Sequence, residues 1–337
     1  MPIYLPGDIY FTDQDDVAPM SWDMPQAILN GPNTYTLAGN DLITGTSSYY
    51  AIDTGGAGFV NRESATINTG NGRDLITGEG LLTFDDYGNP YDNDHYDGVP
   101  YDGYHGYGID NRGSIETGDD EDNLSSYGTF YNSGMVSLGD GDDGLYAHCP
   151  QSNIAQNEYS LLNYGTIEAG NGDDFLNVIG SFNNSGSVSL GHGNDSLRIS
   201  ANDYHNSETL LNSQTIETGE GDDRITARVI ENFGSINTGN GKDSLIGRDF
   251  YGNGNIFLGN GDDYLRGFGT GYYEGGNDQD FLELTSGDYI IGSYGGIVSF
   301  TKNGYNQTMQ TFGFEKLIAG STIYDFTSLS DGLLIYV

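Results

Sequence analysis

The chain is poor in the residues that mark disulfide-bonded, membrane-spanning or ordinary globular proteins. It contains a single cysteine in 337 residues, Cys149, so no disulfide can form within the chain. No stretch approaches the ~18 consecutive apolar residues of a membrane-spanning helix, so we expect no membrane insertion. Proline occurs only 8 times, and hydrophobic residues make up 36%, less than in an average globular domain. An extracellular chain of this kind would have to be stabilised by something other than disulfides.

Basic residues are also scarce. Lys and Arg total 11 against 49 Asp and Glu, which gives a formal net charge of −38. Nucleic acids and anionic membrane surfaces attract basic patches, so neither is expected as a partner. The acids recur beside glycines and aliphatic residues at regular positions, which a merely disordered acidic chain does not require. When such a chain folds and brings these acids together, cations are their natural partners.

Glycine is plentiful, at 53 residues, and much of it lies in one repeated pattern. "INTGNGRDLITG" starts at Ile67, "VSLGDGDDGL" at Val136 and "INTGNGKDSL" at Ile236. The shared pattern is aliphatic-x-x-Gly-x-Gly-x-Asp-x-aliphatic. Its aspartates are Asp74, Asp122, Asp143, Asp174, Asp195, Asp223, Asp243, Asp263 and Asp280. The successive gaps of 48, 21, 31, 21, 28, 20, 20 and 17 residues indicate a unit of about 20 residues with insertions.

Each unit carries two short strand patterns separated by two turns. In one unit Ile236 and Thr238 are expected to point inward, and Ser235 and Asn237 outward. One turn is the glycine turn, and the other contains Asn-x-Gly. Stacking such units predicts an all-β fold, a parallel β-solenoid of about 9–10 coils. The Asn-x-Gly asparagines are predicted to stack in a structural column formed by Asn111, Asn132, Asn163, Asn184, Asn212 and Asn232.

The glycine turns are the candidate metal site. Two glycines allow a turn with positive φ that aims carbonyl groups inward, and the aspartate returns its carboxylate to the same concavity. Stacking repeats these oxygens every ~4.8 Å, where only a cation can offset their repulsion. Ca²⁺ accepts six to eight oxygen ligands in flexible geometry, which suits carbonyls and carboxylates better than Mg²⁺ would. The predicted ligand turns comprise Gly70, Gly72, Asp74, Gly118, Asp122, Gly139, Gly141, Asp143, Gly170, Gly172, Asp174, Gly191, Gly193, Asp195, Gly219, Gly221, Asp223, Gly239, Gly241, Asp243, Gly259, Gly261, Asp263 and Asp280.

This pattern resembles the RTX, or haemolysin-type, calcium-binding nonapeptide repeat Gly-Gly-x-Gly-x-Asp-x-aliphatic-x. The stretch from Gly239 to Leu245 matches all but the first glycine, a position that only Gly275 keeps. In that family consecutive nonapeptides place ions along both edges of a β-roll. Here the glycine turns alternate with Asn-x-Gly turns, so we expect one ladder of several Ca²⁺ ions, roughly eight, along one edge. Asp120 and Asp278 replace the second glycine, which puts those two sites in doubt.

The insertions form a second group of candidate residues. All three fall between the post-aspartate strand and the Asn-x-Gly turn, so we expect them at one edge on every second coil. His95, His105, His148 and His205 lie in or beside them, as does Cys149. The largest insertion, 79–108, is rich in Tyr, Asp and Gly. It is interpreted either as a solvated loop, as a carbohydrate or protein contact surface, or as a His/Asp metal site.

Composition divides the chain into three parts. Residues 1–66 are expected to form an N-terminal cap with degenerate coils, 67–285 the repeats, and 286–337 a C-terminal β cap. The N-terminus has no basic and apolar leader of the kind that is cleaved on secretion. "GFEKLIAGSTIYDF" and the closing "DGLLIYV" resemble the ends of RTX proteins, which implies type I secretion through an uncleaved C-terminal signal. A last core strand is the equally weighted alternative for "DGLLIYV", and both can hold.

No catalytic motif occurs in the chain. The leading hypothesis is therefore a non-enzymatic, secreted or cell-surface calcium-binding protein that folds or assembles in extracellular calcium, for example in a surface layer, matrix or filament. Its expected partners are calcium and either further copies of itself or an extracellular polysaccharide. The alternative is a polysaccharide-binding or polysaccharide-active protein that uses the insertions. Ice binding is less favoured, because Glu116 and Glu168 alternate with serines in an outward column and break a regular array.

Overall fold

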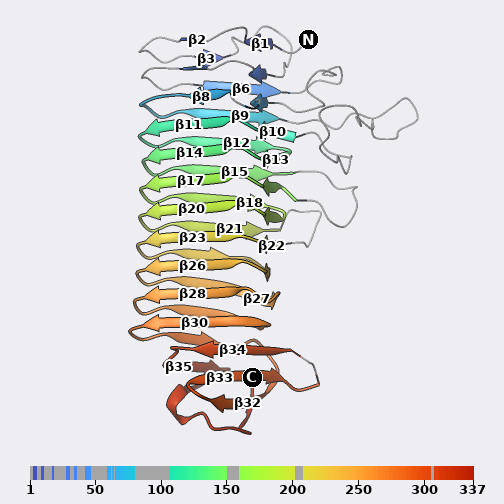
Figure 1. Cartoon of the computed structure of the whole chain (residues 1–337), viewed down its shortest axis with the longest axis vertical. Helices are drawn as coiled ribbons and strands as arrows, with labels where there is room; N and C mark the ends of the chain where they lie inside the picture. The colour runs from blue at the N-terminus through green and yellow to red at the C-terminus, as the bar shows by residue number, and fades with distance from the viewer. Residues whose placement is uncertain are drawn as a thin grey trace, which may run out of the picture.

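The chain folds into stacked coils that wind along one axis (Figure 1). This computed structural model describes residues 59–79 (without 62 and 64), 107–149, 159–201, 208–304 and 307–337, and six short strands that precede them. The architecture confirms the predicted all-β parallel solenoid with a C-terminal β cap. Parallel pairing begins before the recognisable repeats, because strands that precede residue 59 already stack in register with later coils. Among the described residues, no helix could cross a membrane.

The first of two sheets has 15 strands in the described part of the chain, one from each coil and then the cap. In spatial order they are β2 (Ile9–Tyr10), β5 (Thr34–Tyr35), β8 (Thr66–Asn68), β11 (Ser114–Asp119), β14 (Met135–Asp140), β17 (Thr166–Asn171), β20 (Ser187–His192), β23 (Thr215–Glu220), β26 (Ser235–Asn240), β28 (Asn255–Asn260), β30 (Gly271–Asn277), β34 (Thr308–Phe312), β33 (Ile297–Lys302), β32 (Asp288–Tyr294) and β37 (Leu334–Tyr336).

The second sheet has 22 strands among the described residues and contains two rows. The row after the glycine turns comprises β3 (Val17–Ala18), β6 (Leu42–Thr46), β9 (Leu75–Glu79), β12 (Asn123–Tyr127), β15 (Gly144–His148), β18 (Phe175–Ile179), β21 (Ser196–Ser200), β24 (Arg224–Thr226), β27 (Ser244–Tyr251), β29 (Tyr264–Gly269), β31 (Phe281–Glu283) and β35 (Lys316–Ala319), beside which lies β36 (Thr322–Asp325). The row before the Asn-x-Gly turns comprises β1 (Ile3–Leu5), β4 (Ile28–Asn30), β7 (Phe59–Asn61), β10 (Tyr107–Asn111), β13 (Thr129–Asn132), β16 (Leu161–Asn163), β19 (Phe182–Asn184), β22 (Thr209–Asn212) and β25 (Val229–Asn232). A short 3₁₀ helix, η2 (Phe326–Ser328), lies in the cap.

The core consists of columns of aliphatic residues between the two sheets. Ile236 in β26 pairs with Ile216 and Ile256 of the neighbouring coils, and all three are buried. Thr238 is also buried, whereas Ser235 and Asn237 are partly exposed, as the alternation predicts. Burying the same position in every coil fixes the register, because a slip of one residue would turn the whole aliphatic column outward.

The asparagine turns form the predicted structural column. The Nδ2 atom of Asn163 donates to Oδ1 of Asn184 at 2.8 Å and to the carbonyl of Ser187 at 3.1 Å. The same side-chain link joins successive asparagines from Asn61, which the sequence pattern missed, to Asn232. These side chains are buried, so their hydrogen bonds satisfy groups that water cannot reach. The column is structural.

The edge that carries the asparagine turns also carries the insertions. Strands β9, β15 and β21 end at Glu79, His148 and Ser200, which lie in one column of the register on alternate coils. This placement agrees with the predicted spacing of the three insertions. In the described part of the chain, the glycine turns lie at the opposite ends of β9, β15 and β21 from those where the insertions begin.

Candidate metal-binding edge

The glycine turns connect the end of each long first-sheet strand to the next second-sheet strand (Figure 1). Gly172, for example, has φ of 135°, and a Cβ at this position would stand 1.8 Å from the carbonyl oxygen of Gly141 in the neighbouring coil. Glycine is therefore required twice, once for the positive φ and once for the close approach of the next coil. All fifteen predicted turn glycines have positive φ: Gly70, Gly72, Gly118, Gly139, Gly141, Gly170, Gly172, Gly191, Gly193, Gly219, Gly221, Gly239, Gly241, Gly259 and Gly261.

Two turns keep this geometry without their second glycine. Asp120 and Asp278 have φ of 81° and 82°, the only non-glycine residues with positive φ in the described part of the chain. Aspartate tolerates the left-handed region better than most residues, although at some cost in energy. The turn conformation therefore runs unbroken along the edge. Gly276, which the predicted set did not include, takes the first-glycine position beside Asp278.

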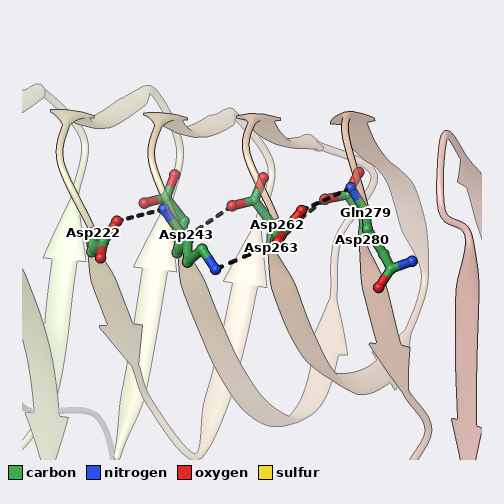
Figure 2. A network of polar contacts seen from close by, with 7 residues as sticks. Asp222, Asp243, Asp262, Asp263, Gln279 and Asp280 are labelled. Carbon is green, nitrogen blue, oxygen red and sulfur yellow. Dashed lines mark hydrogen bonds and ion pairs between the residues drawn. The ribbon is translucent and has the colours of Figure 1, made fainter.

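The nine repeat aspartates form one buried column beneath these turns. Each has a relative exposure of 2% or less. The backbone N–H of Asp243 donates to Oδ1 of Asp263 at 2.8 Å, and that of Asp263 donates to Oδ1 of Asp280 at 3.0 Å (Figure 2). The same bond joins every earlier pair, from Asp74 onward. One carboxylate oxygen in each coil thus fixes the position of the turn in the preceding coil.

The second carboxylate oxygen has no protein partner. Oδ2 of all nine aspartates is buried and makes no hydrogen bond. The hydroxyls of Thr117 and Thr238 donate to the carbonyls of Leu138 and Leu258, although they also lie near the carboxyl groups of Asp122 and Asp243 and partly offset the rise of their pKa values. A buried carboxylate oxygen without a partner is costly, so nine in one column require an explanation.

Burial raises the pKa values of these carboxyl groups. The pKa of Asp122 and of Asp174 is raised from 3.8 to about 8, because desolvation disfavours the charged form and the hydrogen bond from the preceding coil only partly offsets it. The same cause raises the pKa of Asp195, Asp263 and Asp280 to about 7 and that of Asp143 and Asp223 to about 6. Neighbouring acids add to the effect. The column therefore demands positive charge, from protons or from a cation.

Calcium fits this donor set. The free oxygens are hard ligands, they recur once per coil, and the carbonyl oxygens of both turn glycines lie against the glycines of the next coil. Among the described residues, no three His, Cys, Asp or Glu side chains gather into a metal-binding cluster. An ion at this edge would therefore take few carboxylates and complete its shell with backbone oxygens and water, as Ca²⁺ commonly does. Apart from the exposed imidazole of His192, the described turns offer oxygen ligands, which suit neither soft nor nitrogen-preferring metals.

An exposed row of polar residues runs beside the buried column, and the sequence pattern did not identify it. Each lies directly before a buried aspartate. The backbone N–H of Asp173 donates to Oδ1 of Asp142 at 2.8 Å, and that of Gln279 donates to Oδ1 of Asp262 at 3.2 Å. The Nζ atom of Lys242 lies 3.4 Å from Oδ2 of Asp262. The row increases the negative potential along the edge, which attracts cations toward the turns.

The remaining candidates fall into two groups. Glu315 of the cap was not predicted, yet its Oε2 accepts the backbone N–H of Asp280 at 2.8 Å and so ends the column. Gly313 stands two residues before Glu315 with a φ of 72°, but Thr311 takes the place of the first glycine and Glu315 that of the aspartate, so the pattern did not identify this residue. The insertion residues His95, His105 and His205 lie outside the described residues, while His148 is partly buried with its ring edge against Tyr127, and Cys149 is buried. His192 is exposed at a turn, 3.1 Å from Glu220.

No protein-family model matches the sequence, and no curated protein matches it either.

Proposed function

We propose that this chain is a calcium-binding structural protein whose solenoid forms, or completes its formation, when Ca²⁺ occupies the glycine-turn edge. The observation that carries the proposal is the column of buried aspartate Oδ2 atoms, from Asp122 to Asp280, that make no hydrogen bond. The RTX-like glycine and aspartate pattern supports the same assignment, with the variant that only one edge binds ions. Bound Ca²⁺ then offsets the repulsion between the closely spaced carboxylates of the folded state.

The mechanism is thermodynamic linkage. Ions that bind the folded chain and not the unfolded one stabilise it by mass action, so its stability depends on the free calcium concentration. At low calcium, the buried carboxylates must either take up protons or remain charged without a partner, and both states disfavour folding. At millimolar calcium the column is neutralised and the coils stack.

This linkage fits an extracellular role. A low-calcium cytoplasm would keep the chain unfolded and exportable, and calcium outside the cell would fold it without disulfides. Secretion by a type I route, through the C-terminal segment, belongs to the same proposal. The strand β37, within "DGLLIYV", pairs with β32, so the last-strand interpretation of this segment also holds.

A calcium titration of the purified chain tests the proposal. We expect far-UV circular dichroism to change from a disordered to a β-rich spectrum as calcium rises, and isothermal titration calorimetry to detect several ions per chain. Mg²⁺ at the same concentration is the control and should produce much less order. A chain that is equally ordered and equally stable in excess chelator would refute the proposal.

A further inference from the structure

The C-terminal cap exposes an apolar surface on the outward face of the first sheet. Tyr294 is 90% exposed and Tyr336 is 68% exposed, and Ile290, Ile297, Phe312 and Leu334 are each more than a third exposed. All six lie on the antiparallel strands β32, β33, β34 and β37. Large apolar side chains gathered on one sheet face indicate an interaction surface, whereas single exposed residues would not. We call these six residues the cap face.

The strand register arranges the cap face in rows. Tyr294 pairs with Ile297, and Phe312 continues that row onto the solenoid through its pairing with Glu274. A second apolar row contains Ile290 and its partner Leu334. Between the two rows lie small or polar residues, namely Gly292, Ser299 and Gln310. The surface thus consists of a more polar middle row between the apolar row of Tyr294 and the apolar pair of Ile290 and Leu334.

Charge selects the partner. The cap, residues 286–337, has two lysines and four acidic residues, a net charge of −2, while the whole chain has −38. On the body, the same outward face of the first sheet presents Glu116, Glu168 and Glu217. The electrostatic repulsion between two copies is therefore weakest at their caps. A basic partner would prefer the acidic turn edge over this nearly neutral apolar surface.

We propose that the cap face is a homodimer interface, in which the caps of two copies pack face to face about a two-fold axis perpendicular to the solenoid axis. The rows run along the solenoid axis, so this rotation places each row of one copy against the same row of the other, and the apolar side chains of the two copies interdigitate. The cap lies at one end of the molecule (Figure 1), so this arrangement directs the two bodies away from each other. Packed sheets lie about 10 Å apart, which matches the length of these side chains. The inference goes beyond calcium binding and does not depend on it.

Sedimentation velocity in excess calcium tests the proposal. We expect the native chain to sediment mainly as a dimer at about 100 µM. The triple variant Tyr294→Ser, Ile297→Ser, Phe312→Ser should raise the dimer dissociation constant by about 100-fold or more, because it removes one apolar row. These side chains point outward, so unchanged circular dichroism in calcium verifies that the variant is folded. The matched control is Phe233→Ser with Tyr251→Ser, two exposed aromatic residues away from the cap, which should leave the dimer intact.

Salt provides a second readout. An apolar contact between like-charged copies strengthens when salt screens their repulsion, so raising NaCl should tighten the dimer. A native chain that stays monomeric throughout, a triple variant that still dimerises, or a dimer that weakens with salt would each overturn the proposal. The readout is mass rather than order, so failure of this interface is distinguishable from failure of calcium-dependent folding.

Discussion

Replacing one buried aspartate by asparagine should stabilise the metal-free protein and destabilise the protein in calcium. In Asp263→Asn, the side chain keeps the oxygen that accepts the Asp243 N–H. It replaces Oδ2, which has no partner, by an amide NH₂ group and removes the charge. The neighbouring Asp262 is an ideal comparison, because its carboxylate is exposed and also accepts one backbone N–H, that of Gln279. The two substitutions are chemically identical but differ in burial, and Asp262→Asn also removes an exposed ion pair with Lys242.

The magnitude without calcium follows from the raised pKa. Burial raises the pKa of Asp263 from 3.8 to about 7, so ionising it in the folded state above pH 7 costs roughly 4 kcal/mol. The asparagine removes that cost but leaves a buried NH₂ group without an acceptor, a penalty of about 1–3 kcal/mol. We therefore expect Asp263→Asn to stabilise the metal-free protein at pH 8 by roughly 1–3 kcal/mol, an order-of-magnitude value.

With calcium the effect reverses. Asp263 is a proposed ligand for the ions on both sides of its coil. Losing its charge should weaken the affinity of each of these sites for calcium by about tenfold or more, which corresponds to roughly 1.4 kcal/mol per site. Urea denaturation at pH 8, in ~5 mM CaCl₂ and in excess chelator, measures the effect of the substitution on stability with and without calcium. Asp262→Asn should change stability by only about 0.5 kcal/mol in either condition. Equal destabilisation by Asp263→Asn in both conditions would refute the reasoning.

Three further predictions concern pH and the two turns. The pKa values of the aspartate column are raised to about 6–8 in the folded state, which therefore holds protons that the unfolded state has lost. The metal-free protein should consequently lose stability as pH rises from ~4 to ~8. Calcium binding in the same pH range should release protons, which calorimetry in two buffers of different ionisation enthalpy measures. Asn184→Ala removes the two buried donations of its own amide and the acceptor of the Asn163 amide, which keeps only its bond to the Ser187 carbonyl. It should therefore cost about 2–4 kcal/mol in thermal or urea denaturation, and Asn183→Ala, on the outward side, far less. Gly172→Ala places a Cβ 1.8 Å from a backbone oxygen, so it should prevent or strongly weaken folding. The control Gly320→Ala, with nothing within 4 Å of its Cβ, should cost only about 1 kcal/mol of backbone strain. Comparable losses of stability in the two variants would contradict the stacking argument.

The sequence by itself determined the repeat and most of the fold. A period of about 20 residues with aliphatic residues on alternate positions leaves few ways to bury them other than stacking in register, so the inward position of Ile236 and the column from Asn111 to Asn232 could be predicted. The same periodicity predicted that Asp263 and its equivalents align. Repetition carries this information because each unit meets the same environment as the one before it.

Only the tertiary structure decided how the aligned groups bond. It showed that one oxygen of each aspartate accepts a backbone N–H from the neighbouring coil while the other has no partner, a division that depends on turn geometry to within an ångström. It also placed Glu315 at the end of the column and kept Asp120 in a glycine conformation, because neighbouring coils impose the turn. Non-repeating segments, such as the cap with Tyr294 on its outer face, have no copies to compare, so their packing follows from long-range contacts alone.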